Sequence, residues 1–546
     1  MKAILTLLAF CLTWSAAAQK TQTFTLDDTL RGSITPERAW WDLTFYELSV
    51  SVNPGEKSIK GQNVIHYKVL KTNNVLQVDL QPPLVLEKAL QNGQELVIEK
   101  KGRNAYFIHL TAPQKPGTQK SLTVQYSGQP KVAKNAPWDG GFSWSKDQTG
   151  KPFVATSCQG LGASVWWPNK DHAYDEPDSM SIAVTVPDSL MDVSNGRLRS
   201  VTTNSDGTKT YHWFTQNPIN NYGVNVNIAD YVHFSDKFMG EKGELTLDYY
   251  VLPANLEQAK EQFKQVNLML AAFEHWFGPY PFYEDGYKLV QVPYLGMEHQ
   301  SSVTYGNGFK NGYLGMDLSM SGWGLKWDFI IIHESGHEWF ANNITYKDIA
   351  DMWVHEGFTA YSENLYTEYY FGKEAGAAYV IGTRKNIRND QPIIGRYDVN
   401  HEGSGDMYYK GANMLHTIRH IVNDDEKWRQ ILRGLNRDFY HQTVDSKQIE
   451  NYIIQKSGAK LDKVFDQYLR GAQIPVLEYR LKKGQLHYRW SNCVEGFDMP
   501  VKVTLRPGQF EFVHPTTDWK KTPCAVKKAE DFKVDEHFYI TPKTAG

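Results

Sequence analysis

Two histidines and a glutamate lie close together in the apolar segment 331–340. On a helix, residues four positions apart share a face, so His333 and His337 can bind one metal ion, with Glu334 beside them. This H-E-x-x-H spacing is typical of zinc sites in hydrolases, and we expect one Zn²⁺ per chain. Gly336 interrupts the predicted helix, where glycine is about 1 kcal/mol less favourable than alanine. Its presence indicates that another element approaches closely.

A catalytic zinc ion needs a third protein ligand and one open position. Glu356 is our candidate, because the 18 residues between it and His337 leave room for a helix end, a turn and the start of an antiparallel helix. His355 is the rival, but it would point from a different helical face. Glu363 shares the face of Glu356, so it is either a partner that orients a ligand histidine or an exposed acid.

The residues around these ligands resemble the signature of a known family. Its pattern is H-E-x-x-H, then 18 residues, then a glutamate with W and E-G-F around it. The flanking matches are Trp339, Phe340, Asn342, Thr345, Trp353, Gly357, Phe358 and Tyr361. The pattern is similar to that of the zinc aminopeptidases that include aminopeptidase N and leukotriene hydrolase, the gluzincin metallopeptidases. The resemblance covers the chain from about residue 30 to 545.

This resemblance also implies a peptide site. Gly296, Met297 and Glu298 resemble the family's G-x-M-E-N stretch, which implies that Glu298 binds a free α-amino group while the backbone of Gly296 and Met297 aligns the peptide like an edge strand. The stretch 158–160, Cys-Gln-Gly, resembles a substrate loop, which implies a further polar contact from Gln159.

The family's Y-x-K-G-A element is matched at 408–412, and the resemblance selects Tyr408 over Tyr409 as the hydroxyl that stabilises an oxyanion. Glu334 is the expected general base, which takes a proton from a metal-activated water and passes it to the leaving amine. Together these assignments predict a zinc aminopeptidase acting on peptides with a free N-terminus.

Two positions depart from the family pattern, Leu295 and His299, which stands where the family has Asn. We expect His299 to alter the first side-chain pocket or the amine site. Three alternatives therefore stay open: a zinc endopeptidase, another hydrolase on the same metal such as an epoxide-opening enzyme, and a catalytically silent peptide-binding protein.

The rest of the chain predicts a multidomain α+β fold. Residues 19–245 alternate polar and apolar residues between turn residues, which predicts an antiparallel β-domain. Helical patterns dominate much of 246–472, the predicted catalytic domain, which the resemblance implies is thermolysin-like and rich in helices. Residues 473–546 return to strands as a small β-module, where larger family members carry a helical domain over the cleft.

Residues 1–18 have the charge, apolar run and A-x-A site of a secretory signal peptide. No later segment is apolar enough to cross a membrane, so we expect an exported protein, periplasmic or secreted. The net charge of −3 at pH 7 argues against a nucleic-acid partner. Cys493 and Cys524 can form a disulfide in an oxidising compartment, but neither that pair nor the oligomeric state follows from the sequence.

Overall fold

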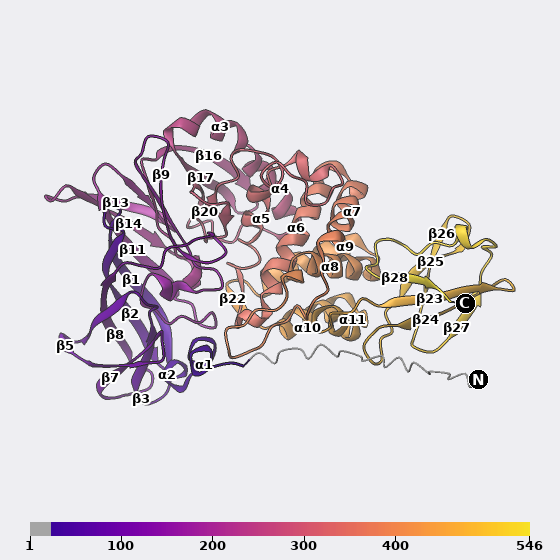
Figure 1. Ribbon diagram of the computed structural model, residues 1–546, viewed down its shortest axis with the longest axis horizontal. Coiled ribbons are helices and arrows are strands. Elements are labelled where there is room, and N and C mark those ends of the chain that lie inside the picture. The colour runs from indigo at the N-terminus through magenta and orange to yellow at the C-terminus, as the bar shows by residue number, and fades with distance from the viewer. Residues whose placement is uncertain (1–22, 546) are drawn as a thin grey trace, which may run out of the picture.

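The computed structural model describes residues 23–545, so the expected signal peptide at 1–18 lies outside the described residues. Figure 1 shows three parts along the long axis: an N-terminal β-part (23–231), a helical part (232–472) and a C-terminal module (473–545). This order, a β-rich part, a helical part and a second β-rich part, is the one expected from the sequence. Across the described range, no helix is both long and apolar enough to cross a membrane.

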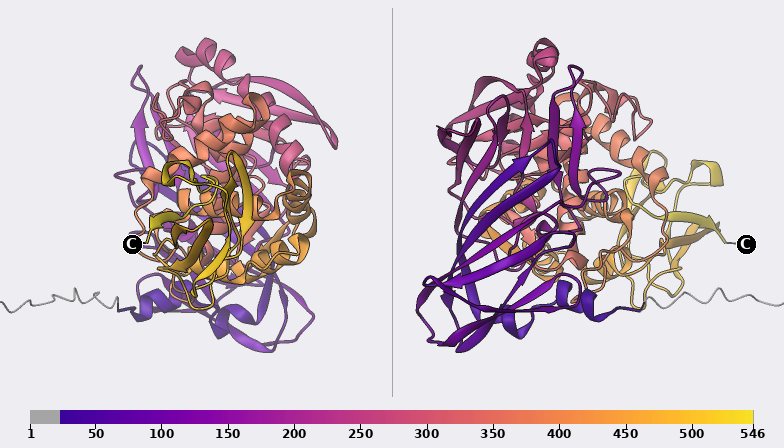
Figure 2. Two further views of the ribbon diagram at one scale, coloured as in Figure 1. Left: turned by 90° about the vertical axis from the view of Figure 1, so that its right-hand side faces the viewer. Right: turned by 60° about the vertical axis from the view of Figure 1, so that its left-hand side comes forward.

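The N-terminal β-part is built on an eight-stranded sheet, whose long strands come forward in the right-hand view of Figure 2. Buried and exposed residues alternate along much of β1, as expected for a sheet with one face on a core. The pairs are antiparallel except β1 with β11, which run parallel because a long connection separates them. In sheet order the strands are β13 (Arg197–Thr203), β14 (Thr208–Thr215), β11 (Ser179–Pro187), β1 (Trp41–Asn53), β2 (Ser58–Val69), β8 (Gln119–Gly128), β4 (Val85–Gln91) and β5 (Gln94–Glu95).

Two smaller sheets complete this part. One contains β3 (Asn73–Asp79), β7 (Ala105–Gln114) and β6 (Val97–Lys101); the other contains β12 (Met191–Val193), β15 (Asn227–Ala229), β10 (Pro152–Ser157) and β9 (Gly141–Lys146). Two short helices, α1 (Leu26–Gly32) and α2 (Pro36–Ala39), precede them. The strand β10 ends at Ser157, so it delivers the chain directly to Gln159.

The helical part opens with a five-stranded sheet that ends in the G-M-E stretch. Its order is β16 (Val232–Gly240), β17 (Gly243–Val251), β18 (Tyr287–Gln291), β20 (Val303–Tyr305) and β19 (Gly296–Met297). The hairpin of β16 and β17 pairs with β18, so this sheet crosses the division expected at 245/246, which falls inside β17. The exact domain boundaries stay a prediction.

The helices of this part pack around one buried pair, α5 and α6. They are α3 (Leu256–Gln262), α4 (Gln265–Phe277), α5 (Phe329–Gly336), α6 (Trp353–Phe371), α7 (Lys373–Gly382), α8 (Tyr409–Val422), α9 (Asp425–Asp438), α10 (Ser446–Ser457) and α11 (Asp462–Leu469). Asp328 caps α5, because its carboxylate accepts hydrogen bonds from the backbone of Ile330 and Ile331. The helix is shorter than the sequence pattern predicts and ends at Gly336.

Glycines set how closely these helices approach. A Cβ on Gly336 would lie 2.7 Å from Ser362 Oγ on α6, which confirms the close approach expected at this glycine. A Cβ on Gly411 would lie 3.0 Å from Gly357 Cα, so the E-G-F and K-G-A motifs contact each other through their glycines. This contact brings the start of α8 against the metal-ligand region of α6.

The C-terminal module shares a hydrophobic core with the helical part, as one buried cluster runs from Leu245 to Phe538. Its strands are β23 (Val476–Lys482), β24 (Gln485–Ser491), β27 (Lys520–Pro523) and β28 (Thr541–Thr544) in one sheet and β25 (Val501–Arg506) with β26 (Gln509–Val513) in another. Cys158, Cys493 and Cys524 are free thiols, so the structure contains no bond between the two cysteines considered for pairing.

Candidate metal centre and peptide site

The three predicted metal ligands converge. One ligand atom from each of His333, His337 and Glu356 lies within 4.8 Å of the other two. Glu356 Oε2 is 3.6 Å from His333 Nε2 and 3.3 Å from His337 Nε2. Neighbouring ligand atoms of a tetrahedral zinc are separated by about 3.3 Å, given Zn–N distances of about 2.0–2.1 Å. Glu356 Oε2 is buried without a hydrogen-bond partner, so the residues present fit a zinc ion.

Both histidines are held by their other ring nitrogen. His333 Nδ1 lies 2.7 Å from Glu363 Oε1, and His337 Nδ1 lies 3.0 Å from the carbonyl oxygen of Phe340 and from Thr359 Oγ1. Such contacts fix the tautomer and turn Nε2 toward the metal. The sequence left two possible roles for Glu363, a partner that orients a ligand histidine or an exposed acid. The side chain is fully buried, so it is not an exposed acid.

His355 is not placed to be a ligand. Its Nε2 accepts a hydrogen bond from the backbone N–H of Tyr346 at 2.9 Å, and its Nδ1 lies 3.4 Å from the hydroxyl of Tyr222. The ring stacks on Tyr346 with centroids 4.2 Å apart. Both nitrogens are therefore occupied, Nε2 within the helical part and Nδ1 at its contact with the N-terminal β-part.

Three carboxylates share this buried site. Burial raises the pKa of Glu298 above its ordinary value and raises the pKa of Glu334 to about 7. Burial would also raise the pKa of Glu356, but His337 and His333 outweigh it and hold that pKa well below its usual range. Glu356 therefore stays ionised, as a metal ligand must.

The residues predicted for peptide binding meet the metal ligands in one place. Gln159 Nε2 donates to Glu298 Oε1 at 2.5 Å and to Glu356 Oε1 at 2.9 Å. Glu298 follows β19, which pairs with β20 on one side and is the edge strand of its sheet. The backbone of Gly296 and Met297 thus has a free edge along which an extended peptide can pair.

Tyr408 lies at the N-cap of α8, beside the metal ligands. Its ring is 6.0 Å from that of His333, nearly parallel to it. Burial and the negative charges of Glu356 and Glu298 raise the pKa of Tyr408 well above its ordinary value. The phenol therefore keeps its proton and can donate a hydrogen bond. Tyr409 also borders the site, but the carboxylate whose negative charge adds to burial in raising the pKa of Tyr409 is Glu363.

These side chains line one cavity of about 220 Å³. Several residues that line this cavity were not predicted from the sequence: Pro137, Trp138, Tyr313, Leu318, Phe329 and Ile330. A neighbouring hollow of about 710 Å³ shares Trp138, Gln159 and Tyr408 and continues past His401 and Glu402. None of these wall residues belongs to a spaced motif, so only the fold reveals them.

His299 does not line the cavity, so its expected effect on the first side-chain pocket or the amine site stays a prediction. The side chain of His299 is fully buried. Its Nδ1 lies 3.3 Å from Thr304 Oγ1, on the strand next to β19. Leu295, the other departure, does line the cavity, so it is the substitution that touches the site.

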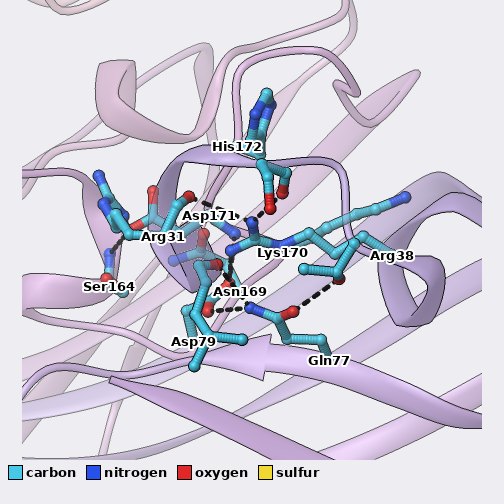
Figure 3. A network of polar contacts seen from close by, with 12 residues as sticks. Arg31, Arg38, Gln77, Asp79, Ser164, Asn169, Lys170, Asp171 and His172 are labelled. Carbon is cyan, nitrogen blue, oxygen red and sulfur yellow. Dashed lines mark hydrogen bonds and ion pairs between the residues drawn. The ribbon is translucent and has the colours of Figure 1, made fainter. Parts of the chain in front are cut away.

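An ionic network fixes the loop that carries Gln159 (Figure 3). Asp171 pairs with Arg31 of α1 and accepts a hydrogen bond from the backbone N–H of Ser164 at 3.1 Å. Asp79 at the end of β3 binds Arg38 Nη2 at 2.5 Å and the N–H of Asp171 at 3.2 Å. The loop is thus tied to the N-terminal helices.

We predict that Glu363→Gln weakens zinc binding by about 10- to 100-fold, the usual effect of losing the partner of a ligand histidine. The measurement is zinc affinity by competition with a chromogenic chelator. The matched control is Glu374→Gln on α7, where the side chain is exposed. Equal affinities in the two variants would show that Glu363 does not support His333.

Comparisons with known proteins agree with this geometry. Residues 43–222 match the "Peptidase M1 N-terminal domain" and residues 261–468 the "Peptidase family M1 domain". Aminopeptidase B of Mus musculus is 23% identical over 56% of this chain and 46% of its own length, so this chain spans about half of that relative. Leukotriene A-4 hydrolase of Xenopus laevis is 23% identical over 69% of this chain and 64% of its own length.

Among solved structures, an M1 zinc metallopeptidase from Deinococcus radiodurans is similar with a TM-score of 0.67 and 21% identity, covering 81% of this chain and 97% of that one. This similarity shows a shared fold over most of the chain. The two domain matches together cover most of the chain, and the chain belongs to the peptidase family M1.

Proposed function

We propose that this protein is a zinc aminopeptidase that removes N-terminal residues from peptides. The observation that carries the proposal is the position of Glu298. One of its oxygens lies within 4.8 Å of ligand atoms of both Glu334 and His337, so an acid suited to a free ammonium stands beside the metal ligands. Support also comes from relatives named aminopeptidases and from a structure of the Deinococcus enzyme with a Tyr-Ser-Ala substrate.

The residues then divide the work. His333, His337 and Glu356 would hold the zinc ion, which would lower the pKa of a bound water to about 7 and polarise the scissile carbonyl. Glu334 accepts a proton from the water and returns it to the leaving amine. Tyr408 donates a hydrogen bond to the carbonyl oxygen as negative charge develops there.

Glu298 selects the substrate end. Its carboxylate would pair with the α-ammonium, and Gln159, which already contacts it, would hold it in position. The edge of β19 would align the first residues of the peptide. Because Glu298 would fix the ammonium next to the metal, the bond that reaches the metal would be the first peptide bond.

We predict that N-terminal acetylation of aminoacyl-anilides greatly reduces cleavage, because a blocked amine cannot pair with Glu298. Glu298→Gln should lower the preference for free over blocked substrates by at least about tenfold, since a hydrogen bond to a charged group is worth about 1.5–3 kcal/mol. The measurement is kcat/KM on both substrates. Equal cleavage of free and blocked substrates by the unaltered protein would instead identify an endopeptidase.

We predict that Glu334→Gln keeps its zinc but turns over about 10²- to 10⁴-fold more slowly, the range for losing a general base. Zinc content and kcat are measured on the same preparation, with Glu374→Gln as the control. Full activity in the Glu334 variant would refute its role as base. Zinc-loaded unaltered protein without any turnover would favour a silent peptide-binding protein.

We also propose that the protein is exported, to a periplasm or outside the cell, with residues 1–18 removed as a signal peptide. The support is the order of a basic residue, an apolar run and small residues before Gln19. We predict that the intact mass of the protein recovered from the exported fraction corresponds to a chain beginning at Gln19. Recovery of the full-length chain from the cytoplasm alone would contradict export.

A further inference from the structure

A second cluster of histidines lies away from the metal centre, where α8 meets the C-terminal module. His416 and His420 are four residues apart on α8, and His537 comes from the segment before β28. One ring nitrogen of each lies within 4.8 Å of the other two. Figure 1 shows α8 next to this module. The sequence alone could have pointed to His416 and His420, because an i, i+4 histidine pair on a helix shares one face. It could not have pointed to His537.

The geometry is close to that of a metal site. His416 Nε2 is 2.9 Å from His537 Nδ1, and the rings of His420 and His537 are stacked with centroids 3.9 Å apart. The nitrogens of a tetrahedral zinc site lie about 3.3 Å apart. The stacked rings of His420 and His537 lie in nearly parallel planes, 7° apart, so one of these imidazoles must turn before all three nitrogens can face one ion.

The surroundings leave the imidazoles available. His416 is buried, and His420 and His537 are partly buried. His416 Nδ1 is buried without a hydrogen-bond partner. One nitrogen of His416 is therefore not used by the hydrogen bonds of the protein.

Of the nearby positive charges, Arg419 is neutralised by acids, whereas Arg384 and Lys502 contact neutral oxygens. Arg419 is held by both oxygens of Glu368, at 2.6 and 2.7 Å, and by Asp425 at 2.8 Å. Arg384 donates to the carbonyl oxygens of Glu536 and His537, at 2.7 and 3.4 Å, which fixes the segment that carries the third histidine. Lys502 contacts Asn423 at the end of α8. The acids Asp535 and Glu536 next to His537 favour a cation.

We propose that His416, His420 and His537 bind a second divalent transition-metal ion, zinc, that fastens the C-terminal module to α8. Three imidazoles suit zinc, and one position would remain for water. The site is independent of the catalytic one: Tyr408 lies at the start of α8, and His416 is about two turns further along. Because α8 carries Tyr408, the ion would steady the helix that positions this hydroxyl.

The first test counts metal. The unaltered protein, dialysed against metal-free buffer after loading with zinc, should hold two zinc ions per chain. His420→Ala, a change at a side chain that is not fully buried, should hold one, and so should His337→Ala. The double variant should hold none. His514→Ala is the control, because this exposed histidine lies in the same module, and it should hold two.

The second test separates metal binding from packing. In the His337→Ala background, which lacks the catalytic site, added zinc should raise the melting temperature, and cobalt should give the visible absorption of a tetrahedral nitrogen site. Adding His537→Gln should abolish both effects while circular dichroism shows the fold intact. The proposal is overturned if the unaltered protein holds one zinc ion, or if zinc and cobalt have no effect in the His337→Ala protein. Neither result would affect the proposed peptidase activity, which is measured separately.

Discussion

Three carboxylates, Glu298, Glu334 and Glu356, are buried within a few ångströms of one another, and the site depends on neutralising them. Burial is the largest cause of the raised pKa of Glu298 and of Glu334, and the charges of the neighbouring carboxylates raise both pKa values further. Two histidines compensate Glu356, but their own nitrogens are needed for a metal. A divalent ion and a substrate ammonium each remove part of this repulsion. One electrostatic constraint would therefore account both for metal binding and for the proposed preference for a free N-terminus.

The spacing of these charges is set by backbone contacts rather than by the charged residues. Gly336 lets α5 lie against α6, and the contact between Gly357 and Gly411 lets α8 do the same. Close packing transmits small displacements. A methyl group at Gly411 would push the start of α8 outward and move Tyr408 away from His333. The glycines in these motifs are thus part of the site, although they offer no functional group.

Local spacing predicted the residues that lie on one helix or on adjacent ones. His333, His337 and Glu356 come together as expected because an i, i+4 pair and a helical hairpin leave little freedom. The contact of Gln159 with Glu298 joins residues 139 positions apart, so no periodicity could reveal it, and only the family resemblance pointed to it. His299 shows a different limit. The residues just before it in the sequence line the cavity, whereas its own side chain is fully buried. The direction of one side chain beside a short edge strand depends on packing that sequence patterns do not encode.

The two β-rich parts support the site from different sides. The N-terminal β-part contributes the loop with Gln159, held by Asp171 and Arg31, and Tyr222, which contacts His355. The C-terminal module contacts α8, the helix that begins beside Tyr408, and shares its hydrophobic core. Gln159, which would hold Glu298 in position, and Tyr408, which would stabilise the oxyanion, are therefore fixed by separate parts of the chain. Relative motion of those parts would change the distance between the two side chains, so the proposed cleavage at a fixed distance from the N-terminus would depend on both attachments.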